Sequence, residues 1–196
     1  NWHYESHRRT TQDDFYLIKT DLKCNTIWTK TYGGTGNDWG VDLKQTPDGG
    51  FILCGYTNSF GSGSYDFYLI KTDSNGNQLW QKTYGGSFLD GASDVILTTD
   101  GGYLITGENH DNYNVIKTDS AGNVIWNKTY GGSGIDYGVE TLALADGNFL
   151  TVGYTDSSGT GNSNIYLLKL STFGDIIWSK TFGGGANENG LSIKAS

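Results

Sequence analysis

Four acidic residues recur along this chain at nearly regular intervals, each a few residues after a Gly-Gly pair. They are Asp38, Asp90, Asp136 and Glu188. Equivalent residues of a repeat lie on a circle about its axis, so the four carboxylates are expected to form a ring on one face. Such oxygens are the ligands that Ca²⁺ prefers. The ring is therefore a candidate calcium site, and the interpretation we favour is that each acid caps its loop or clamps the next blade, because clustered charges in repeats are often packing devices.

Other chemistry-bearing residues lie close to this ring in the sequence. Trp39 and Tyr137 directly follow two of the acids and offer flat faces on which a sugar ring can stack. His110 stands beside Asp111, but no serine or cysteine nucleophile is fixed next to it, and a catalytic group needs nucleophile, base and orienting residue together. We therefore expect no enzymatic activity and a protein or glycan as the partner. His110, Trp39, Tyr137 and the four acids are the residues expected to bind it.

The elements that position these residues form a repeat. Its landmark tryptophans are Trp28, Trp80, Trp126 and Trp178, separated by 52, 46 and 52 residues. In the second copy, residues 67–72 and 78–84 are runs of β-formers around the polar turn 73–77, which predicts a hairpin. A second hairpin is predicted from residues 92–98 and 103–107 around the turn 100–102. Each copy is therefore expected to form four antiparallel strands.

Four-stranded units in series favour an all-β fold, a single β-propeller domain over residues 1–196. The predicted blades are residues 39–84, 91–130 and 137–182, and a last blade shared by residues 189–196 and 1–32. In that last blade, residues 191–194 would supply the innermost strand, and Trp2-His3-Tyr4 would align with Cys54-Gly55-Tyr56. The alternative is half of an eight-bladed ring formed by two chains, so the chain is expected to be a monomer or a strand-exchanged homodimer.

The connections between the second and third strands differ most between copies, and specificity is expected there. They are residues 5–14, 58–65, 108–112 and 156–163. Eight lysines also recur at the period, namely Lys19, Lys71, Lys117 and Lys169, and Lys30, Lys82, Lys128 and Lys180. We expect their stems to lie across aromatic rings while the ammonium groups reach water. Cys54 is predicted to be a buried thiol, and Cys24 an exposed one in a turn.

Composition limits the possible functions. The 196 residues carry 13 Lys and Arg against 21 Asp and Glu, a formal net charge of −8, which repels a nucleic-acid backbone. No apolar run is long enough to cross a bilayer, so no membrane insertion is expected. No cofactor is implied beyond the possible Ca²⁺. The sequence begins with Asn1, which we interpret as the start of a mature product or a fragment.

The recurring segments carry a family resemblance. Residues 66–72, Trp80, Tyr84-Gly85-Gly86 and Asp100-Gly101-Gly102-Tyr103 resemble the β-propeller repeat of secreted bacterial and archaeal surface proteins. This resemblance covers nearly the whole chain and implies an extracellular or cell-surface scaffold or binding module rather than one chemistry. The hairpin from Asp73 to Trp80 also resembles the tryptophan-docking motif of quinoprotein dehydrogenase propellers, but the motif is one residue shorter here. A quinoprotein or hydrolase activity is the less favoured alternative.

Overall fold

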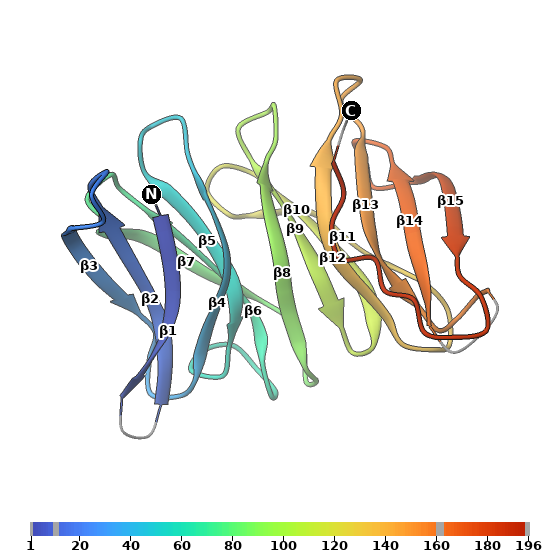
Figure 1. Cartoon of the computed structure of the whole chain (residues 1–196), viewed down its shortest axis with the longest axis horizontal. Helices are drawn as coiled ribbons and strands as arrows, with labels where there is room; N and C mark the ends of the chain where they lie inside the picture. The colour runs from blue at the N-terminus through green and yellow to red at the C-terminus, as the bar shows by residue number, and fades with distance from the viewer. Residues whose placement is uncertain (1, 10–11, 160–162, 195–196) are drawn as a thin grey trace. The chain divides into compact units, whose positions relative to one another are not determined.

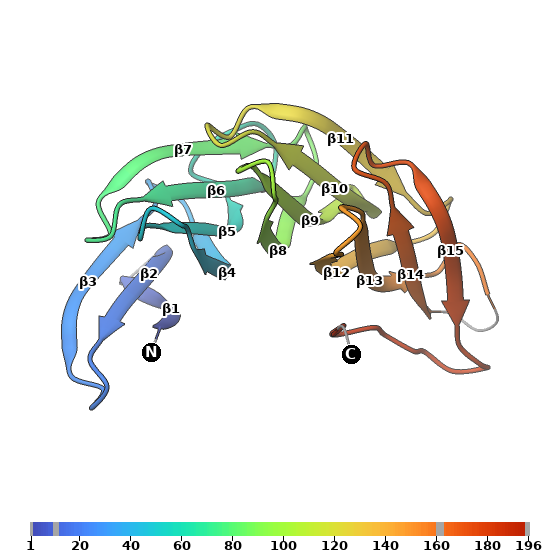
Figure 2. The ribbon, with the colours of Figure 1, turned by 90° about the horizontal axis from the view of Figure 1, so that it is seen from above.

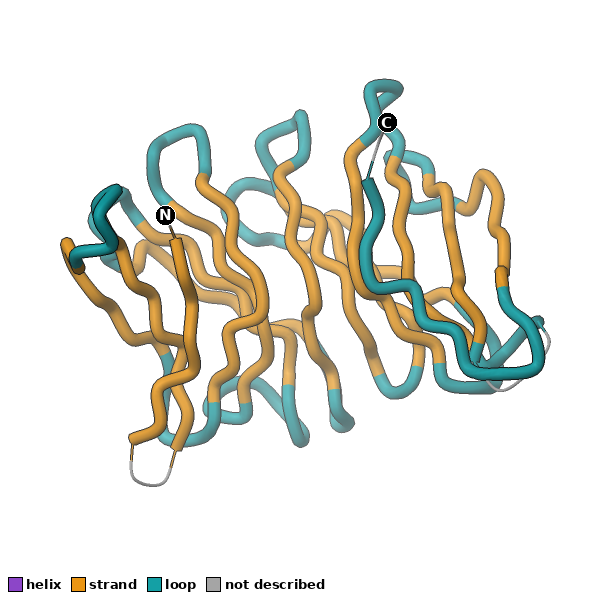
Figure 3. Tube along the Cα trace, in the orientation of Figure 1, coloured by secondary structure: helices purple, strands orange, loops and turns teal. Residues whose placement is uncertain are grey.

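The computed structural model describes residues 2–9, 12–159 and 163–194. In these ranges the chain consists of strands, turns and loops, with no helix (Figure 3). The described residues form fifteen strands in four sheets, and all strand pairs within the sheets are antiparallel. The prediction of an all-β repeat is confirmed.

Each sheet is a simple meander in which consecutive strands are neighbours (Figures 1 and 2). The first sheet has three strands, β1 (Trp2–Arg9), β2 (Gln12–Thr20) and β3 (Thr26–Tyr32). The second contains β4 (Asp38–Gln45), β5 (Phe51–Thr57), β6 (Asp66–Thr72) and β7 (Gln78–Tyr84). The third contains β8 (Asp90–Leu97), β9 (Tyr103–Asn109), β10 (Asn112–Thr118) and β11 (Val124–Tyr130). The fourth contains β12 (Asp136–Ala143), β13 (Phe149–Thr155), β14 (Asn164–Leu170) and β15 (Ile176–Phe182).

The strand sequences explain which strands lie inside each sheet. All seven residues of β6 are buried, because this strand pairs on both edges and packs on both faces. Its edge neighbour β7 is half-buried to exposed along its length. The tryptophan-bearing strands β3, β7, β11 and β15 all lie at a sheet edge.

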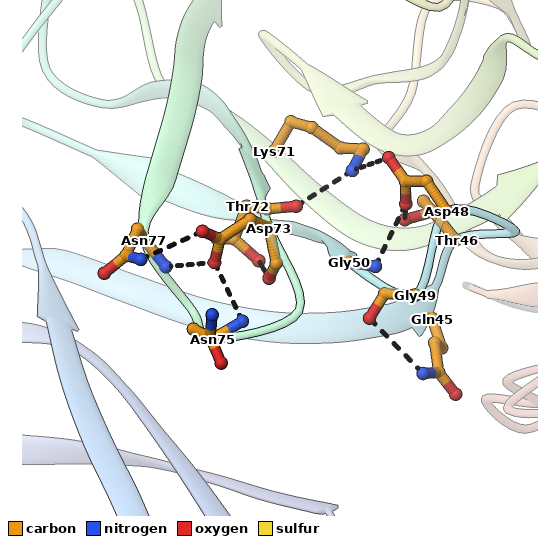
Figure 4. Close-up of polar contacts among 10 residues, drawn as sticks. All are labelled: Gln45, Thr46, Asp48, Gly49, Gly50, Lys71, Thr72, Asp73, Asn75 and Asn77. Carbon is orange, nitrogen blue, oxygen red and sulfur yellow. Dashed lines mark hydrogen bonds and ion pairs between the residues drawn. The ribbon is translucent and has the colours of Figure 1, made fainter.

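The five-residue turn before each edge strand is held by its own side chains. In the second sheet, Asp73 Oδ1 accepts hydrogen bonds from the amides of Asn75 and Asn77, both at 2.8 Å (Figure 4). Gly76 adopts a φ of +73°, a conformation that favours glycine. We call residues 21–25, 73–77, 119–123 and 171–175 the docking turns.

Two compact units make up the chain, residues 1–92 and 93–196. In the first unit, sheets β1–β3 and β4–β7 share a core that includes Phe15, Leu17, Phe51 and Tyr68. In the second, the core includes Leu104, Tyr113, Phe149 and Leu168. Edge-to-face ring contacts contribute to both cores, with centroids 5.3 Å apart for Phe15 and Tyr68.

Within each unit, the edge strand of one sheet docks on the docking turn of the next. In the first unit, the Trp28 ring lies against Gly76, and Tyr32 Oη donates to Gly76 O at 2.7 Å. Lys30 Nζ donates to Asn77 Oδ1 at 2.9 Å. A Cβ at residue 76 would lie 2.7 Å from the Trp28 ring, so the contact requires glycine.

The second unit repeats this contact with equivalent residues. Trp126 lies against Gly174 and its Nε1 donates to Thr172 O at 3.1 Å. Tyr130 Oη donates to Gly174 O at 2.7 Å, and Lys128 Nζ pairs with Asp175 Oδ1 at 2.6 Å. We call the Trp-x-Lys-x-aromatic strands β3, β7, β11 and β15 the docking strands.

The predictions for the chain ends need correction. Tyr4 pairs opposite Leu17, and Cys54 pairs opposite Leu69, so Trp2–Tyr4 correspond to Ile52–Cys54 and not to Cys54–Tyr56. The strand predicted at residues 191–194 is not formed, and residues 183–194 contain no strand. A strand forms only when a neighbouring strand takes its hydrogen bonds. Here the amide of Ile193 donates to Glu140 Oε2 at 2.6 Å instead.

Two of the predicted loops are also much shorter than expected. Strand β1 continues to Arg9 and β2 begins at Gln12, so most of the predicted loop 5–14 is strand. Similarly, β9 and β10 leave only His110 and Asp111 between them, with φ of +46° and +64°. Two consecutive positive φ values are typical of the tight type I′ hairpin turn. Parts of the predicted loop 156–163 fall on residues 160–162, outside the described residues.

Candidate functional site

Three of the recurring acids, Asp38, Asp90 and Asp136, begin the first strand of their sheets, and Asp38 shows what they do there. Its carboxylate is completely buried at the start of β4. Oδ2 accepts from the amide of Gly34 at 2.9 Å and from Ser59 Oγ at 2.6 Å, and Oδ1 accepts from Thr57 Oγ1. Ser59 Oγ in turn accepts from the amide of Gly36 at 2.8 Å. One carboxylate thus joins the Gly-Gly loop to the loop that follows β5.

Asp136 repeats this arrangement in the second unit. It is also completely buried, and its Oδ2 accepts from the amide of Gly132 at 2.8 Å and from Ser157 Oγ at 2.7 Å. Oδ1 accepts from Thr155 Oγ1, and Ser157 Oγ accepts from the amide of Gly134 at 2.9 Å. Asp38 and Asp136 therefore both bind their own loops, which is the first of the two structural roles expected from the sequence.

The other two acids make part of the same arrangement. Asp90 is buried, and its Oδ2 accepts from the amide of Gly86 at 2.6 Å. Glu188 is half-buried, and its Oε2 accepts from the amide of Gly184 at 3.0 Å. The described residues contain no group of three or more His, Cys, Asp or Glu side chains that could hold a metal ion. The calcium site at the four acids remains a prediction.

A second polar residue lies beside each acid, at the start of the third strand. Asp66 is buried at the start of β6, where its Oδ2 accepts a hydrogen bond from the amide of Ser62 at 2.8 Å. The carboxylates of Asp66 and Asp90 both lie against Gly85, in the space that a side chain at that position would fill. Burial and the nearby charge of Asp90 raise the pKa of Asp66, against the lowering effect of the Ser62 amide. The second unit has Asn112 and Asn164 at the equivalent positions. The first unit therefore buries two carboxylates where the second has an amide and a carboxylate.

Replacing Asp66 with asparagine is expected to stabilise the protein by about 1 kcal/mol at neutral pH. Because the pKa of Asp66 is higher in the folded than in the unfolded protein, folding favours its protonated form. The free energy of unfolding is therefore highest below the unfolded-state pKa and falls as the pH rises through the folded-state pKa. The gain from Asp66→Asn should therefore shrink towards zero below about pH 4. Urea unfolding of both proteins between acid and neutral pH measures this difference. The reverse change, Asn164→Asp beside Glu188, should destabilise the protein at neutral pH. If either variant changed the free energy of unfolding equally at every pH, charge repulsion between the paired residues would be the wrong explanation.

Part-exposed aromatic pairs stand next to two of the acids. The Trp39 ring stacks on Tyr56, with centroids 6.3 Å apart and planes at 20°. Tyr137 stacks on Tyr154, with centroids 5.4 Å apart and planes at 7°. All four side chains are half-buried, and Tyr65 adds an edge contact to Tyr56 at 5.5 Å. The structure thus places the predicted residues Trp39 and Tyr137 in pairs with tyrosines that sequence reasoning missed.

The missed residues share a sequence signal. Gly-Tyr-Thr-x-Ser occurs at residues 55–59 and again at 153–157, and it carries both the stacking tyrosine and the two hydroxyls that bind the acid. The third sheet has Gly91 and Glu108 where the second and fourth sheets have the aromatic pair. The aromatic pairs therefore occur once in each unit, at the same place.

His110 lies in the hairpin turn between β9 and β10, where its carbonyl accepts from Asn112 Nδ2 at 2.9 Å. The neighbouring carbonyl of Asp111 accepts from the amide of Asp136 at 2.8 Å. The turn therefore binds the start of β12 through its backbone. Its role in ligand binding remains a prediction.

Lys19 agrees with the prediction, because its Nζ lies 5.9 Å from the centre of the Trp28 ring, but its counterparts in the other three sheets differ from it. Lys71 is buried, and Nζ pairs with Asp48 at 2.8 Å and donates to Thr72 O at 2.8 Å (Figure 4). The hydrogen bonds from Lys71 and Thr46 lower the pKa of Asp48 to about 2. Equivalent pairs join Lys117 to Asp100 at 2.8 Å and Lys169 to Asp146 at 2.7 Å. These ammonium groups fasten the turn between the first two strands of their sheets and do not extend into water.

The edge-strand lysines are closer to expectation. Lys180 Nζ lies 5.8 Å from the centre of the Trp178 ring, while Lys30 and Lys128 reach the next docking turn. The two thiols are as predicted, with Cys54 buried and Cys24 exposed. Among the described residues, no helix is long and apolar enough to cross a membrane.

A small pocket of about 150 Å³ opens in the second unit, at the opposite end of β8 from Asp90. Its lining combines Phe149 and Leu144 with the Asp100 and Lys117 pair. Because that ion pair already fastens a turn, the aromatic pairs are the stronger candidate for ligand contact.

Comparisons with known proteins add little to this site. No protein-family model matches the sequence, and no curated protein matches it. One similar solved structure is described as a crystal structure of the eukaryotic initiation factor, with a TM-score of 0.49 and 12% sequence identity. The match covers 96% of this chain and 44% of that one, so the chain spans less than half of that structure. The residues of the site itself therefore carry the functional proposal.

Proposed function

We propose that this chain is a non-catalytic binding module whose ligand surface is formed by the aromatic pairs and the loops around them. The main support for this proposal is the stacked aromatic pair beside a buried acid, which occurs at the same position in both units. Asp38 and Asp136 are engaged with the amides and hydroxyls of their loops. Their role is to hold the loops rigidly, which lowers the entropy lost when a ligand binds.

A glycan is the ligand class that this surface fits best. Flat, part-exposed aromatic faces accept the apolar face of a sugar ring, and the neighbouring loop amides and carbonyls suit its hydroxyl groups. A protein partner is the other candidate, since tyrosine and tryptophan are also enriched at protein interfaces. Secretion or surface display is part of the proposal and is supported by the sequence resemblance.

The proposal includes a β-propeller as the architecture. Sheet β1–β3 has three strands where the others have four, and residues 188–194 repeat the sequence pattern of β4, β8 and β12. A strand from residues 188–194 would complete that sheet. If the same chain supplies it, a four-bladed ring results, and if a second chain supplies it, the ring has eight blades.

A glycan array tests the binding function. The purified chain is expected to bind at least one glycan class. The double variant Trp39→Ala/Tyr137→Ala should bind it at least about tenfold more weakly, because truncating an aromatic residue at the centre of a binding surface usually costs that much affinity. Phe173→Ala, an exposed aromatic in a docking turn, is the matched control and should bind as the parent does. Repeating the array in Ca²⁺ and in chelator tests the predicted calcium site. An array without any bound glycan would contradict the glycan proposal.

A further inference from the structure

The aromatic pairs of the two units differ in the charge of a neighbouring residue. In the second unit, the exposed Asp156 directly follows β13, and its amide donates to Ile135 O at 2.8 Å, just ahead of β12. This bond lies next to the strand pair that holds the stacked rings of Tyr137 and Tyr154. In the first unit, Asn58 makes the equivalent bond at 3.0 Å. The second pair therefore has a carboxylate where the first has a neutral amide.

Glu108 brings a second carboxylate to the pair of the second unit. It lies in β9 at the position that a tyrosine occupies in the second and fourth sheets. Two residues earlier in the same strand, Thr106 Oγ1 lies 2.7 Å from Thr141 Oγ1 of β12. Because side chains two apart in a strand point to the same face, Glu108 extends from β9 toward the first strand of the fourth sheet.

Both charges act on a ring of the stacked pair. Burial raises the pKa of Tyr154, and the negative charges of Glu108 and Asp156 raise it further. Negative charges that oppose loss of the hydroxyl proton also attract a positive charge to the same place. The face of a tyrosine ring attracts a cation as well. The pair of the second unit therefore combines two features that favour a cationic ligand.

We propose that the aromatic pair of the second unit selects amino sugars that carry a free, protonated amine, while the pair of the first unit takes neutral sugars. The sugar ring stacks on the tyrosine pair, and its ammonium group lies between the carboxylates of Asp156 and Glu108. Acetylation of the amine removes the positive charge and with it this attraction. The inference rests on the proposed glycan binding and specifies the ligand class of one of its two sites.

Two single variants separate the sites. Trp39→Ala disables the first pair and Tyr137→Ala the second. Both are applied to an array of glucosamine and galactosamine oligosaccharides, each printed with free amines and with every amine acetylated. The assay is run at about pH 6, where both carboxylates are ionised. Trp39→Ala should bind at least one free-amine oligosaccharide about fivefold or more tightly than its acetylated form, as an exposed ion pair with a cation–π contact allows. Tyr137→Ala should show no such preference.

Charge variants in the Trp39→Ala protein locate the cause of the preference. Asp156→Asn, which supplies the residue type of the first unit, should lower the preference by about threefold, and adding Glu108→Gln should abolish it. Binding of the acetylated form should not change. Asp146→Asn is the matched control, because it removes the same charge from the turn at the other end of β12 and β13. Its full preference would show that the net charge of −8 is not the cause.

The reverse change tests the same explanation in the first unit. In the Tyr137→Ala protein, Asn58→Asp should create a preference for the free-amine form of about twofold or more, because it supplies one of the two carboxylates. Circular dichroism of every variant shows that the sheets are retained.

The results that would overturn this inference differ from those that would overturn the proposed function. Equal or tighter binding of the acetylated oligosaccharides by Trp39→Ala would overturn the inference and leave glycan binding intact. The same holds for a preference that Asp156→Asn/Glu108→Gln leaves unchanged, or that Asp146→Asn also removes. Loss of all binding in Trp39→Ala would assign the glycan to the first pair alone and overturn the inference too. An array on which the parent binds no glycan would overturn both.

Discussion

Replacing Asp136 with alanine is expected to lower the free energy of unfolding by about 3 kcal/mol, although the residue lies outside the apolar core. The carboxylate is completely buried and accepts from Gly132, Ser157 and Thr155. Alanine leaves these donors without their acceptor, and a buried donor that loses its partner costs more than the bond itself was worth. Urea unfolding of the parent and the variant measures the loss.

Glu188→Ala is the position-matched control. Glu188 is half-buried and bonds the amide of Gly184, so its removal should cost less than about 1 kcal/mol. If the acids hold loops, the melting temperature of the parent should be the same in Ca²⁺ and in chelator. A Ca²⁺-dependent melting temperature that Asp136→Ala abolishes would instead support the predicted metal site.

The second large effect is expected at the docking contact, where Trp126→Ala should cost about 3 kcal/mol. The ring packs against the core of the second unit and covers Gly174, and Nε1 donates to Thr172 O. Alanine removes both the apolar contact and the hydrogen bond. Tyr130→Phe, which removes the bond to Gly174 O alone, should cost about 1 kcal/mol.

Trp178→Ala is the control for this effect, because it is the same residue of the repeat in a strand on which no described turn of the second unit docks. This variant should cost less than about 1 kcal/mol. Chemical unfolding of the three variants under identical conditions gives the comparison. Equal losses at Trp126 and Trp178 would show that the tryptophan stabilises its own strand rather than the contact between sheets.

The local elements of this fold are readable in the sequence because their causes are local. The Asp73 turn contains the carboxylate that binds its own amides and the glycine that takes a positive φ. The strand runs around it have the composition of β-formers. The sequence boundaries of three of the four sheets therefore differ from the observed ones by a single residue.

The lysines show where local reasoning fails. The recurring lysines are predicted to lie across aromatic rings, and Lys19 and Lys180 do so. Lys71 instead is buried against Asp48, a residue from a different hairpin that strand pairing brings beside it. The sequence shows that both residues recur, but their contact depends on the register between β5 and β6.

Sequence reasoning found only part of the candidate site, because it detects residues that recur with the repeat but not the contacts between strands. The acids, Trp39 and Tyr137 recur or stand next to recurring residues, so the period itself marks them. Tyr56 and Tyr154 complete the stacked pairs from the neighbouring strand, and they could have been found only through the repeated Gly-Tyr-Thr-x-Ser motif.

The sequence alone determined that this protein is a repeat of antiparallel sheets with self-supporting turns, because side chains within a few residues of one another cause those features. The tertiary structure decided which acids hold loops and which lysines are buried. It also showed that residues 183–194 form no strand, contrary to the sequence pattern. A strand at the end of a chain depends on hydrogen bonds from a partner strand, and a repeat pattern contains no information about where that partner is.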